Sequence, residues 1–208
     1  MESVNVVDHP LIADRLARLR QKDCSCEQFR LLVHNITCLM VPAVTAELAT
    51  EGTAVETPLE STRGKRLARP IVLVPILRAG LSMAQGFLDL LPEAVVAHIG
   101  LRRNDETLLP EVYYPNAPVD FSRADTILLD PMLATGGSAI EAARLLKQQK
   151  ATRLRYASLI AAPEGVAAFE SLHPDIPLYT AALDRGLNEQ GYICPGLGDA
   201  GDRSFGTL

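Results

Sequence analysis

Hydrophobic and polar positions follow two different rhythms along this chain. In the N-terminal quarter, apolar residues recur every third or fourth position, as in "LIADRLARLR" (11–20), where arginines fill the gaps. That spacing predicts a helix over 11–20. A second helix is predicted from Ser25 to about Ala49, bent or interrupted at Pro42, because proline cannot donate the helical hydrogen bond.

After this region the rhythm changes to short apolar runs that alternate with helical segments. The polar stretch Thr50 to Arg69 is expected to be a loop or an irregular strand. The apolar runs predicted as buried strands are 71–77, 94–101, 125–130, 154–162 and 176–183, and the helices between them are 78–91, 137–149 and 163–172. Continuous apolar strands that alternate with helices indicate a parallel sheet covered on both faces. The sequence therefore predicts an open α/β fold, a mostly parallel twisted sheet flanked by helices, in a single domain over 1–208.

Composition and charge narrow the class of protein. The 208 residues carry a formal net charge of −5, which argues against a broad electrostatic contact with nucleic acid. No apolar run approaches the roughly 18 residues of a membrane helix, and the first ten residues lack the basic start of a signal peptide. The four cysteines form no CxxC pair and no cluster with zinc spacing. We expect a cytoplasmic protein with reduced thiols and neither a membrane nor a nucleic acid as partner.

Polar residues directly after the strands are the candidates for chemistry, because ligands of open α/β sheets bind beyond the carboxyl ends of the strands. Three places qualify: Arg78 to Gly80, Arg102 with Arg103, and Asp130 to Ser138. The first and third also begin predicted helices. We expect their side chains to gather at one edge of the sheet.

The turn Ala134-Thr135-Gly136-Gly137-Ser138 has the chemistry of a phosphate site. Glycines allow a tight turn and close backbone approach, and the helix that follows presents unpaired N–H groups and the positive end of its dipole. The turn is neither a Walker A loop nor GxGxxG. By itself it fits a capped strand-to-helix turn equally well.

Asp130 changes the balance between these interpretations. A carboxylate before a phosphate site would repel a ligand that was phosphate alone, but it accepts strong charge-assisted hydrogen bonds from vicinal hydroxyls. An acid followed by a phosphate turn therefore matches a ribose 5-phosphate. Arg78 could bind a second anion in bidentate fashion, as could Arg103 in the polar stretch 102–118, which is predicted to form a protruding β-arm. Taken alone, Arg102 and Arg103 would fit an exposed, solvated charge pair better than a ligand site.

Several blocks of the sequence resemble the uracil phosphoribosyltransferases. The blocks are "VPILRAGL" (74–81), "RNDETLLP" (103–110), "DPMLATGGS" (130–138), "AAPEGVAAFE" (161–170) and "DRGLNEQGYICPGLGDAGDRSFGT" (184–207). They cover nearly the whole chain. Pro131, where other phosphoribosyltransferases carry a second acid, is the form typical of the uracil enzymes. The resemblance implies the phosphoribosyltransferase fold, with a C-terminal base-binding hood over about 184–208.

The resemblance also implies an activity and residue roles. Similar enzymes join uracil to 5-phosphoribosyl 1-diphosphate (PRPP), giving UMP and diphosphate, with Mg²⁺ carried by the diphosphate rather than by protein ligands. The catalytic residues would be Arg103, Asp130 and Asp199. PRPP would be bound by Arg78, Arg103, Asp130, Pro131, Met132, Leu133, Ala134, Thr135, Gly136, Gly137, Ser138 and Asp199. Uracil would meet Asp199 and the backbone groups of Ile193, Gly198 and Ala200.

Three departures from the family pattern bear on regulation rather than on chemistry. Pro42-Ala43 replaces a usual Tyr-Glu pair, Arg102 replaces a Tyr, and Asn116 replaces a Lys. They leave open the movement of the arm, the subunit contacts and the GTP activation found in some members. We expect a homodimer or higher homo-oligomer. The alternatives are a phosphoribosyltransferase for another base, and an RNA-binding regulator of pyrimidine genes with the same fold, which the net charge does not favour.

Overall fold

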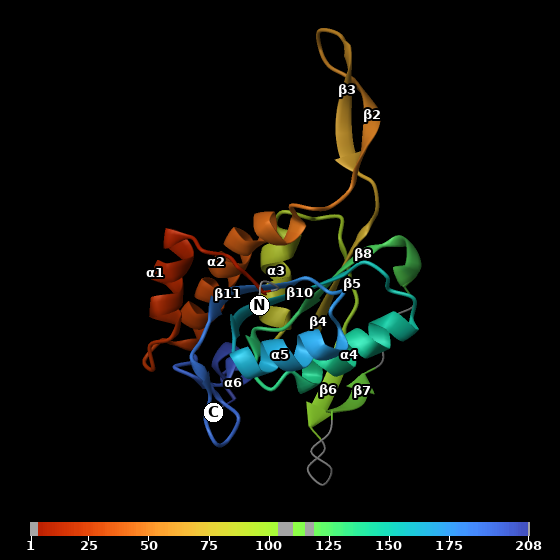
Figure 1. Cartoon of the computed structure of the whole chain (residues 1–208). Helices are drawn as coiled ribbons and strands as arrows, with labels where there is room; N and C mark the ends of the chain where they lie inside the picture. The colour runs from red at the N-terminus through yellow and green to blue at the C-terminus, as the bar shows by residue number, and fades with distance from the viewer. Residues whose placement is uncertain (1–3, 104–109, 115–118, 208) are drawn as a thin grey trace.

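The computed structural model describes residues 4–103, 110–114 and 119–207 (Figure 1). For 102–103 and 110–114 only the backbone is described. The chain forms a central sheet with helices on both of its faces, as the alternation of apolar runs and helical segments predicted. The fold class expected from the sequence is therefore confirmed.

The central sheet has the strand order β1-β11-β10-β8-β4-β6-β7, with β5 paired to β4 and β9 paired to β10. All its described pairings are parallel except β6 with β7. Its strands are β1 (Val4–Val6), β4 (Ile71–Leu77), β5 (Val95–Val96), β6 (Ile99–Arg103), β7 (Pro110–Tyr114), β8 (Asp125–Leu129), β9 (Met132–Leu133), β10 (Leu154–Ala161) and β11 (Leu178–Leu183). Every residue of β8 and β10 is buried, as expected for strands covered on both faces.

The order of the strands reverses direction at β4. From β4 the chain goes to β6 on one side, and it then returns to place β8 on the other side of β4. Such a reversal leaves a crevice at the carboxyl ends of the two central strands, which is where open α/β sheets bind ligands. Arg78 follows β4 and Asp130 follows β8, so two of the predicted site residues lie at this crevice.

The helices divide between the two faces of the sheet (Figure 1). One apolar cluster joins one face to α1 (Pro10–Leu19), α2 (Cys26–Thr45) and α3 (Leu81–Leu88). The other cluster joins the opposite face to α4 (Gly137–Gln148) and α5 (Pro163–Leu172). Alternate residues of β4 separate between the two clusters: Leu73 belongs to the first, whereas Val72 and Val74 belong to the second. This is the two-residue period of a strand buried on both sides.

The segment Thr50 to Arg69 was wrongly predicted as a loop or irregular strand. Strands β2 (Thr50–Glu56) and β3 (Ser61–Leu67) form a regular antiparallel hairpin with seven residue pairs, which projects from the body at the top of Figure 1. Almost all its residues are exposed, so no apolar alternation marked it. The segment predicted as an arm, 102–118, begins with the antiparallel pair β6–β7; residues 104–109 and 115–118 lie outside the described part.

The observed elements differ from the predicted ones in several smaller respects. Helix α2 continues through Pro42 to Thr45 without interruption. The single strand predicted over 94–101 is divided into β5 and β6, which both pair with β4. The sequence missed the short edge strand β1, the two-residue strands β9, β12 (Gly186–Leu187) and β13 (Ile193–Cys194), and helix α6 (Ala200–Phe205). Within the described ranges, no helix has the length and apolar character needed to span a bilayer.

Candidate active site

Two adjoining cavities lie at the carboxyl ends of the central strands. The larger of them, of about 220 Å³, is lined by Ile76, Leu77, Arg78, Ala79, Leu101, Asp130, Met132, Ser138, Asp199 and Gly201. The smaller, of about 90 Å³, is lined by Asp130 and all residues from Met132 to Ala139. Asp130, Met132 and Ser138 belong to both linings, so the cavities form one continuous site. Four segments far apart in the sequence converge here.

The phosphate loop, residues 133–138, leads from β9 into helix α4. Gly136 caps this helix with φ of +86°, a left-handed conformation that favours glycine, and no side chain caps the helix. The first N–H groups of α4 are therefore free to bind an anion. Thr135 and Ser138 make no side-chain hydrogen bond within the described part of the chain, so their hydroxyls are available as further donors.

Helix α5 supports the phosphate loop from behind. A Cβ atom on Gly165 would lie 2.2 Å from the carbonyl oxygen of Ala134 and 2.8 Å from that of Leu133, so only glycine permits this close approach. The N–H of Ala162 also donates to the Leu133 carbonyl at 2.9 Å. These contacts fix the loop before any ligand arrives.

Asp130 is a partly buried carboxylate without a cationic partner among the described residues. Burial raises its pKa to about 7, and the only opposing effect is a hydrogen bond from the Met132 N–H. The pKa of Tyr156 is also raised. The main cause is burial of its ring, and the negative charge of Asp130 is the second cause. A group that is costly to ionise without a partner is stabilised when a ligand supplies hydroxyl donors or a cation.

Arg78 and Asp199 line the larger cavity together with Asp130. A nitrogen of the Arg78 guanidinium lies 3.3 Å from Oδ1 of Asp202, and more than half of the Arg78 side chain is exposed. Asp199 caps α6 by accepting a hydrogen bond from the Asp202 N–H at 2.9 Å. Gly201 brings these groups together, since a Cβ there would lie 3.2 Å from Oδ1 of Asp199.

The hood (residues 184–207 of the described chain) is fixed to helix α1 by buried polar contacts. Arg20 binds both carboxylate oxygens of Asp184, at 2.5 and 2.7 Å, and also donates to the Gly196 carbonyl at 2.7 Å. Arg203 donates to the carbonyl oxygens of Leu19 and Leu197. The hood is therefore positioned by the N-terminal helices, not by the sheet alone.

The structure brings most of the sequence-predicted PRPP residues together, but not every predicted residue reaches the cavities. Pro131 lines neither; its carbonyl oxygen accepts hydrogen bonds from Leu159 and Ile160 and so joins the segment to β10. Ile193, Gly198 and Ala200 line neither cavity. Gly198 and Ala200 are the chain neighbours of Asp199, and Ile193 lies in β13 of the same hood. The side chains of Arg102 and Arg103 and the whole of Asn116 lie outside the described residues.

Sequence reasoning missed the residues that hold the site together. Arg20 and Asp184 are 164 positions apart, and neither shows a local pattern that indicates the other. Gly165 and Gly201 lie inside two of the sequence blocks that resemble the family, 161–170 and 184–207, and that was the one available signal for them. Their role depends on backbone approaches that only the fold creates.

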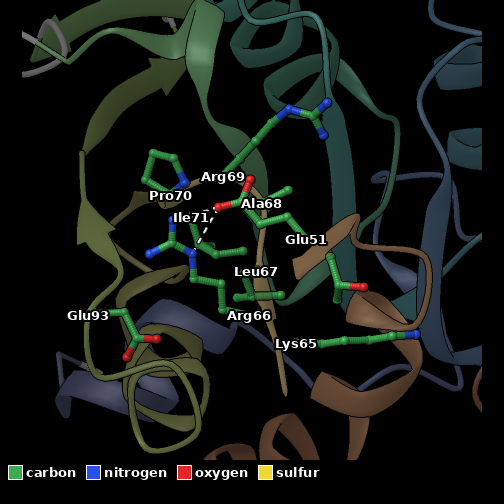
Figure 2. A pocket seen from close by; sticks show the side chains of 10 residues that line it. Glu51, Lys65, Arg66, Leu67, Ala68, Arg69, Pro70, Ile71 and Glu93 are labelled. Carbon is green, nitrogen blue, oxygen red and sulfur yellow. Dashed lines mark hydrogen bonds and ion pairs between the residues drawn. The ribbon is translucent and has the colours of Figure 1, made fainter. Parts of the chain in front are cut away.

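A more spacious cavity, of about 730 Å³, lies at the base of the β2–β3 hairpin (Figure 2). It is lined by Thr50, Glu51, Lys65, Arg66, Leu67, Ala68, Arg69, Pro70, Ile71 and Glu93. Arg66 is already paired there with Glu51: its Nε donates to Oε1 of Glu51 at 2.8 Å, the contact that the dashed line in Figure 2 marks. None of the predicted site residues lines this cavity.

Comparison with known proteins decides the family. The uracil phosphoribosyltransferase family model matches residues 6–207. The chain belongs to this family. Uracil phosphoribosyltransferases of Ligilactobacillus salivarius and Symbiobacterium thermophilum are 50% and 51% identical to it over 208 residues, and each match covers all of both chains.

Solved structures share the fold of this chain. The AQ2163 protein from Aquifex aeolicus, 35% identical, superposes with a TM-score of 0.91 over 97% of each chain. A hypoxanthine phosphoribosyltransferase from Staphylococcus aureus has a TM-score of 0.54 at 13% identity, with 83% of this chain and 81% of that chain covered, which shows a shared fold alone.

Proposed function

We propose that this protein is a uracil phosphoribosyltransferase that converts uracil and PRPP to UMP and diphosphate in pyrimidine salvage. The observation that carries the proposal is the shared wall of the two cavities. One carboxylate, Asp130, lines both cavities; the smaller also contains the free helix N-terminus at the phosphate loop, and the larger also contains Arg78. That order suits a sugar with a phosphate at one end and a diphosphate at the other.

In this proposal each cavity takes one part of PRPP. The 5-phosphate occupies the smaller cavity and accepts hydrogen bonds from the N–H groups of the phosphate loop and from Thr135 and Ser138. The ribose hydroxyls donate to Asp130, which offsets the cost of its ionisation. The diphosphate lies in the larger cavity against Arg78, and Arg103, the last residue of β6, would meet it as well.

Uracil would bind beside Asp199, against backbone groups of the hood. Uracil presents acceptor, donor and acceptor along one edge, whereas cytosine reverses part of that pattern. Backbone N–H and C=O groups of Ile193, Gly198 and Ala200 can offer the complementary order. Buried groups that the wrong base leaves unpaired would give discrimination on the order of 10⁴. The anchoring of the hood by Arg20 supports this, since selectivity of that kind requires fixed groups.

In this reaction the protein has two main tasks: to position the two substrates and to neutralise the negative charge of the leaving diphosphate. The bond between ribose C1 and diphosphate breaks with oxocarbenium character, and uracil N1 attacks from the opposite face. Asp130 and the phosphate loop hold the sugar still during this displacement. Arg78, with Arg103, stabilises the charge that develops on the departing diphosphate. Asp199 is the candidate to accept the uracil N1 proton.

Magnesium fits the residues present. Asp130 and Asp199 both contribute carboxylates to the lining of one cavity, and Mg²⁺ in such sites is held by one or two carboxylates together with substrate phosphates. When bound with the diphosphate, the ion would supply further charge neutralisation. We propose that the protein binds it through the substrate, without a permanent set of protein ligands. A cytoplasmic location, homo-oligomer formation and activation by GTP are further proposals from the family resemblance.

The direct test is incubation of the purified chain with uracil, PRPP and Mg²⁺. We expect UMP and diphosphate in equal amounts, loss of turnover in Asp130→Ala and Arg103→Ala, and retained turnover in Cys24→Ser. Folded protein that makes no UMP would exclude the proposed function. Retained turnover in Asp130→Ala would remove only the role given to that carboxylate.

Two rival functions give different outcomes in simple assays. A phosphoribosyltransferase for another base would consume PRPP with hypoxanthine or cytosine in place of uracil. An RNA-binding regulator would bind RNA at micromolar protein with an affinity that falls steeply as salt is raised. The identity to full-length uracil phosphoribosyltransferases supports the uracil enzyme over both.

A further inference from the structure

Three side chains with metal-ligating atoms meet between helices α2 and α3, away from the cavities described above. They are His34 and Cys38 of α2 and Asp89, which follows the last residue of α3. One ligand atom from each lies within 4.8 Å of the other two, and within the described residues no other group of three His, Cys, Asp or Glu side chains does this. His34 and Cys38 are four residues apart and therefore share one face of α2.

We propose that His34, Cys38 and Asp89 form a binding site for one Zn²⁺ ion that links α2 to α3. The set combines a nitrogen, a sulfur and a carboxylate oxygen, which are the ligand types that zinc takes in proteins. Three protein ligands leave the fourth tetrahedral position for water. The His34 and Asp89 side chains are 28% and 43% exposed, so solvent and a metal ion can reach the site.

The distances between the ligand atoms suit tetrahedral coordination. Nε2 of His34 lies 3.6 Å from Sγ of Cys38 and 3.1 Å from Oδ2 of Asp89. Tetrahedral zinc with ordinary bond lengths requires about 3.5 Å between nitrogen and sulfur and about 3.3 Å between nitrogen and oxygen. Both distances from the imidazole nitrogen therefore match, and the thiol sulfur and the carboxylate oxygen lie within 4.8 Å of each other.

The geometry also argues against a catalytic Cys-His-Asp triad. In a triad the two nitrogens of the imidazole face different partners, one the nucleophile and the other the carboxylate. Here the same nitrogen, Nε2, faces both the thiol and the carboxylate. Three atoms that converge on one point are typical of ligands around a cation.

Surrounding contacts hold the ligands in place. Gln85 donates from Nε2 to the other carboxylate oxygen of Asp89 at 2.8 Å, an outer contact of the kind that orients metal ligands. Gly86 allows the helices to approach, because a Cβ there would lie 2.8 Å from Cβ of Thr37. The C-terminus of α3 is the negative end of the helix dipole, and the last turn contains no basic residue that would interact with it. A cation bound near Asp89 would therefore interact favourably with this dipole.

Binding requires loss of one proton from Cys38. Burial and the nearby charge of Asp89 raise the pKa of this thiol. Formation of the sulfur–zinc bond therefore transfers the thiol proton to buffer, while the histidine binds through the neutral Nε2 lone pair. No electron transfer and no co-reactant is involved.

The test is metal titration of the chain after treatment with a chelator, without PRPP or other phosphates. We expect one equivalent of Zn²⁺ to bind at micromolar concentration or below, to release protons and to raise the unfolding temperature. Co²⁺ in its place should give the thiolate charge-transfer band and the strong visible bands of tetrahedral cobalt. Cys38→Ser should remove the charge-transfer band and weaken Zn²⁺ binding by at least 10–100-fold, by analogy with losses at outer-shell partners.

Matched variants separate the site from other thiols and from folding defects. Cys24→Ser should bind Zn²⁺ as the wild type does, and His34→Gln and Asp89→Asn should each bind more weakly while remaining folded without metal. Absence of Zn²⁺ binding at micromolar concentration, or an unchanged dissociation constant in Cys38→Ser, would overturn the proposal. Because UMP formation is not a readout here, the outcome is independent of the proposed enzymatic function.

Discussion

The guanidinium of Arg20 binds both carboxylate oxygens of Asp184 and, through the same nitrogen that lies 2.7 Å from Oδ2, the carbonyl oxygen of Gly196. This pair joins the C-terminal end of α1 to the start of the hood. The Asp184 side chain is only 4% exposed, so its charge depends on Arg20 for compensation. The proposed uracil pocket is therefore coupled to a helix that contributes nothing to the catalytic cavities.

Removal of one partner of this pair should destabilise the protein and impair uracil binding. We expect Arg20→Met to lower the free energy of unfolding by about 3 kcal/mol, the lower end of the range for a broken buried pair, and to raise the KM for uracil more than that for PRPP. Urea unfolding and steady-state kinetics measure the two effects. Arg18→Met is the matched control, because Arg18 pairs with Asp14 on the exposed face of α1. Loss of that ion pair should lower the free energy of unfolding by less than about 1 kcal/mol. Equal effects of both variants would contradict the anchoring role.

Replacement of Asp130 by Asn should stabilise the unliganded protein in a pH-dependent way. Burial raises the pKa of Asp130 to about 7 from 3.8, so between these values the folded state binds more protons than the unfolded state. The stability that this group contributes is complete below the unfolded pKa and is lost as the pH rises through about 7. The free energy of unfolding of Asp130→Asn should therefore be higher than that of the wild type by about 1–3 kcal/mol at a pH of about 8. The difference should be smaller at a pH of about 5.

Urea unfolding of both proteins across this pH range measures the difference. The same variant should lose turnover, because the amide cannot accept from two ribose hydroxyls as the carboxylate does. A stability difference that does not change with pH would show that Asp130 is already ionised in the unliganded protein.

Substitution of Gly165 should disturb the phosphate loop without any change in a ligand-binding side chain. The added methyl group would meet the Ala134 carbonyl oxygen at 2.2 Å, so the loop or α5 must shift. We expect Gly165→Ala to cost about 1–3 kcal/mol of stability and to lower kcat/KM for PRPP by roughly 10²-fold. Gly52→Ala is the control, since a Cβ there meets nothing within 4 Å. Normal kinetics in Gly165→Ala would exclude the supporting role of α5.

Arg78 should matter for turnover and little for folding. Its side chain is 55% exposed, and among the described residues its one ion pair is with Asp202, at 3.3 Å. We expect Arg78→Met to change the free energy of unfolding by no more than about 0.5 kcal/mol and to lower kcat/KM by about 10²–10³-fold. Arg66→Met, on the exposed hairpin, should leave kinetics unchanged. A large stability loss in Arg78→Met would indicate a structural role instead.

Much of the fold follows from local sequence. The apolar runs of β4, β8 and β10 are nearly unbroken because both faces of the sheet are covered, and that pattern alone predicted their place in a parallel sheet. The β2–β3 hairpin was missed for the opposite reason. It is exposed on both faces, so its pairing depends on backbone hydrogen bonds that leave no period in the hydrophobic pattern.

The same division runs through the site. Local sequence predicted the phosphate loop and the acid before it, since a glycine turn at a helix start and a carboxylate after a buried strand can be recognised without the fold. The tertiary fold places Arg78, Asp199 and Asp130 in the lining of one cavity, packs Gly165 against the loop and joins Arg20 to the hood. These relationships join residues far apart in the sequence, and they depend on the order in which the strands and helices pack, which no local pattern encodes.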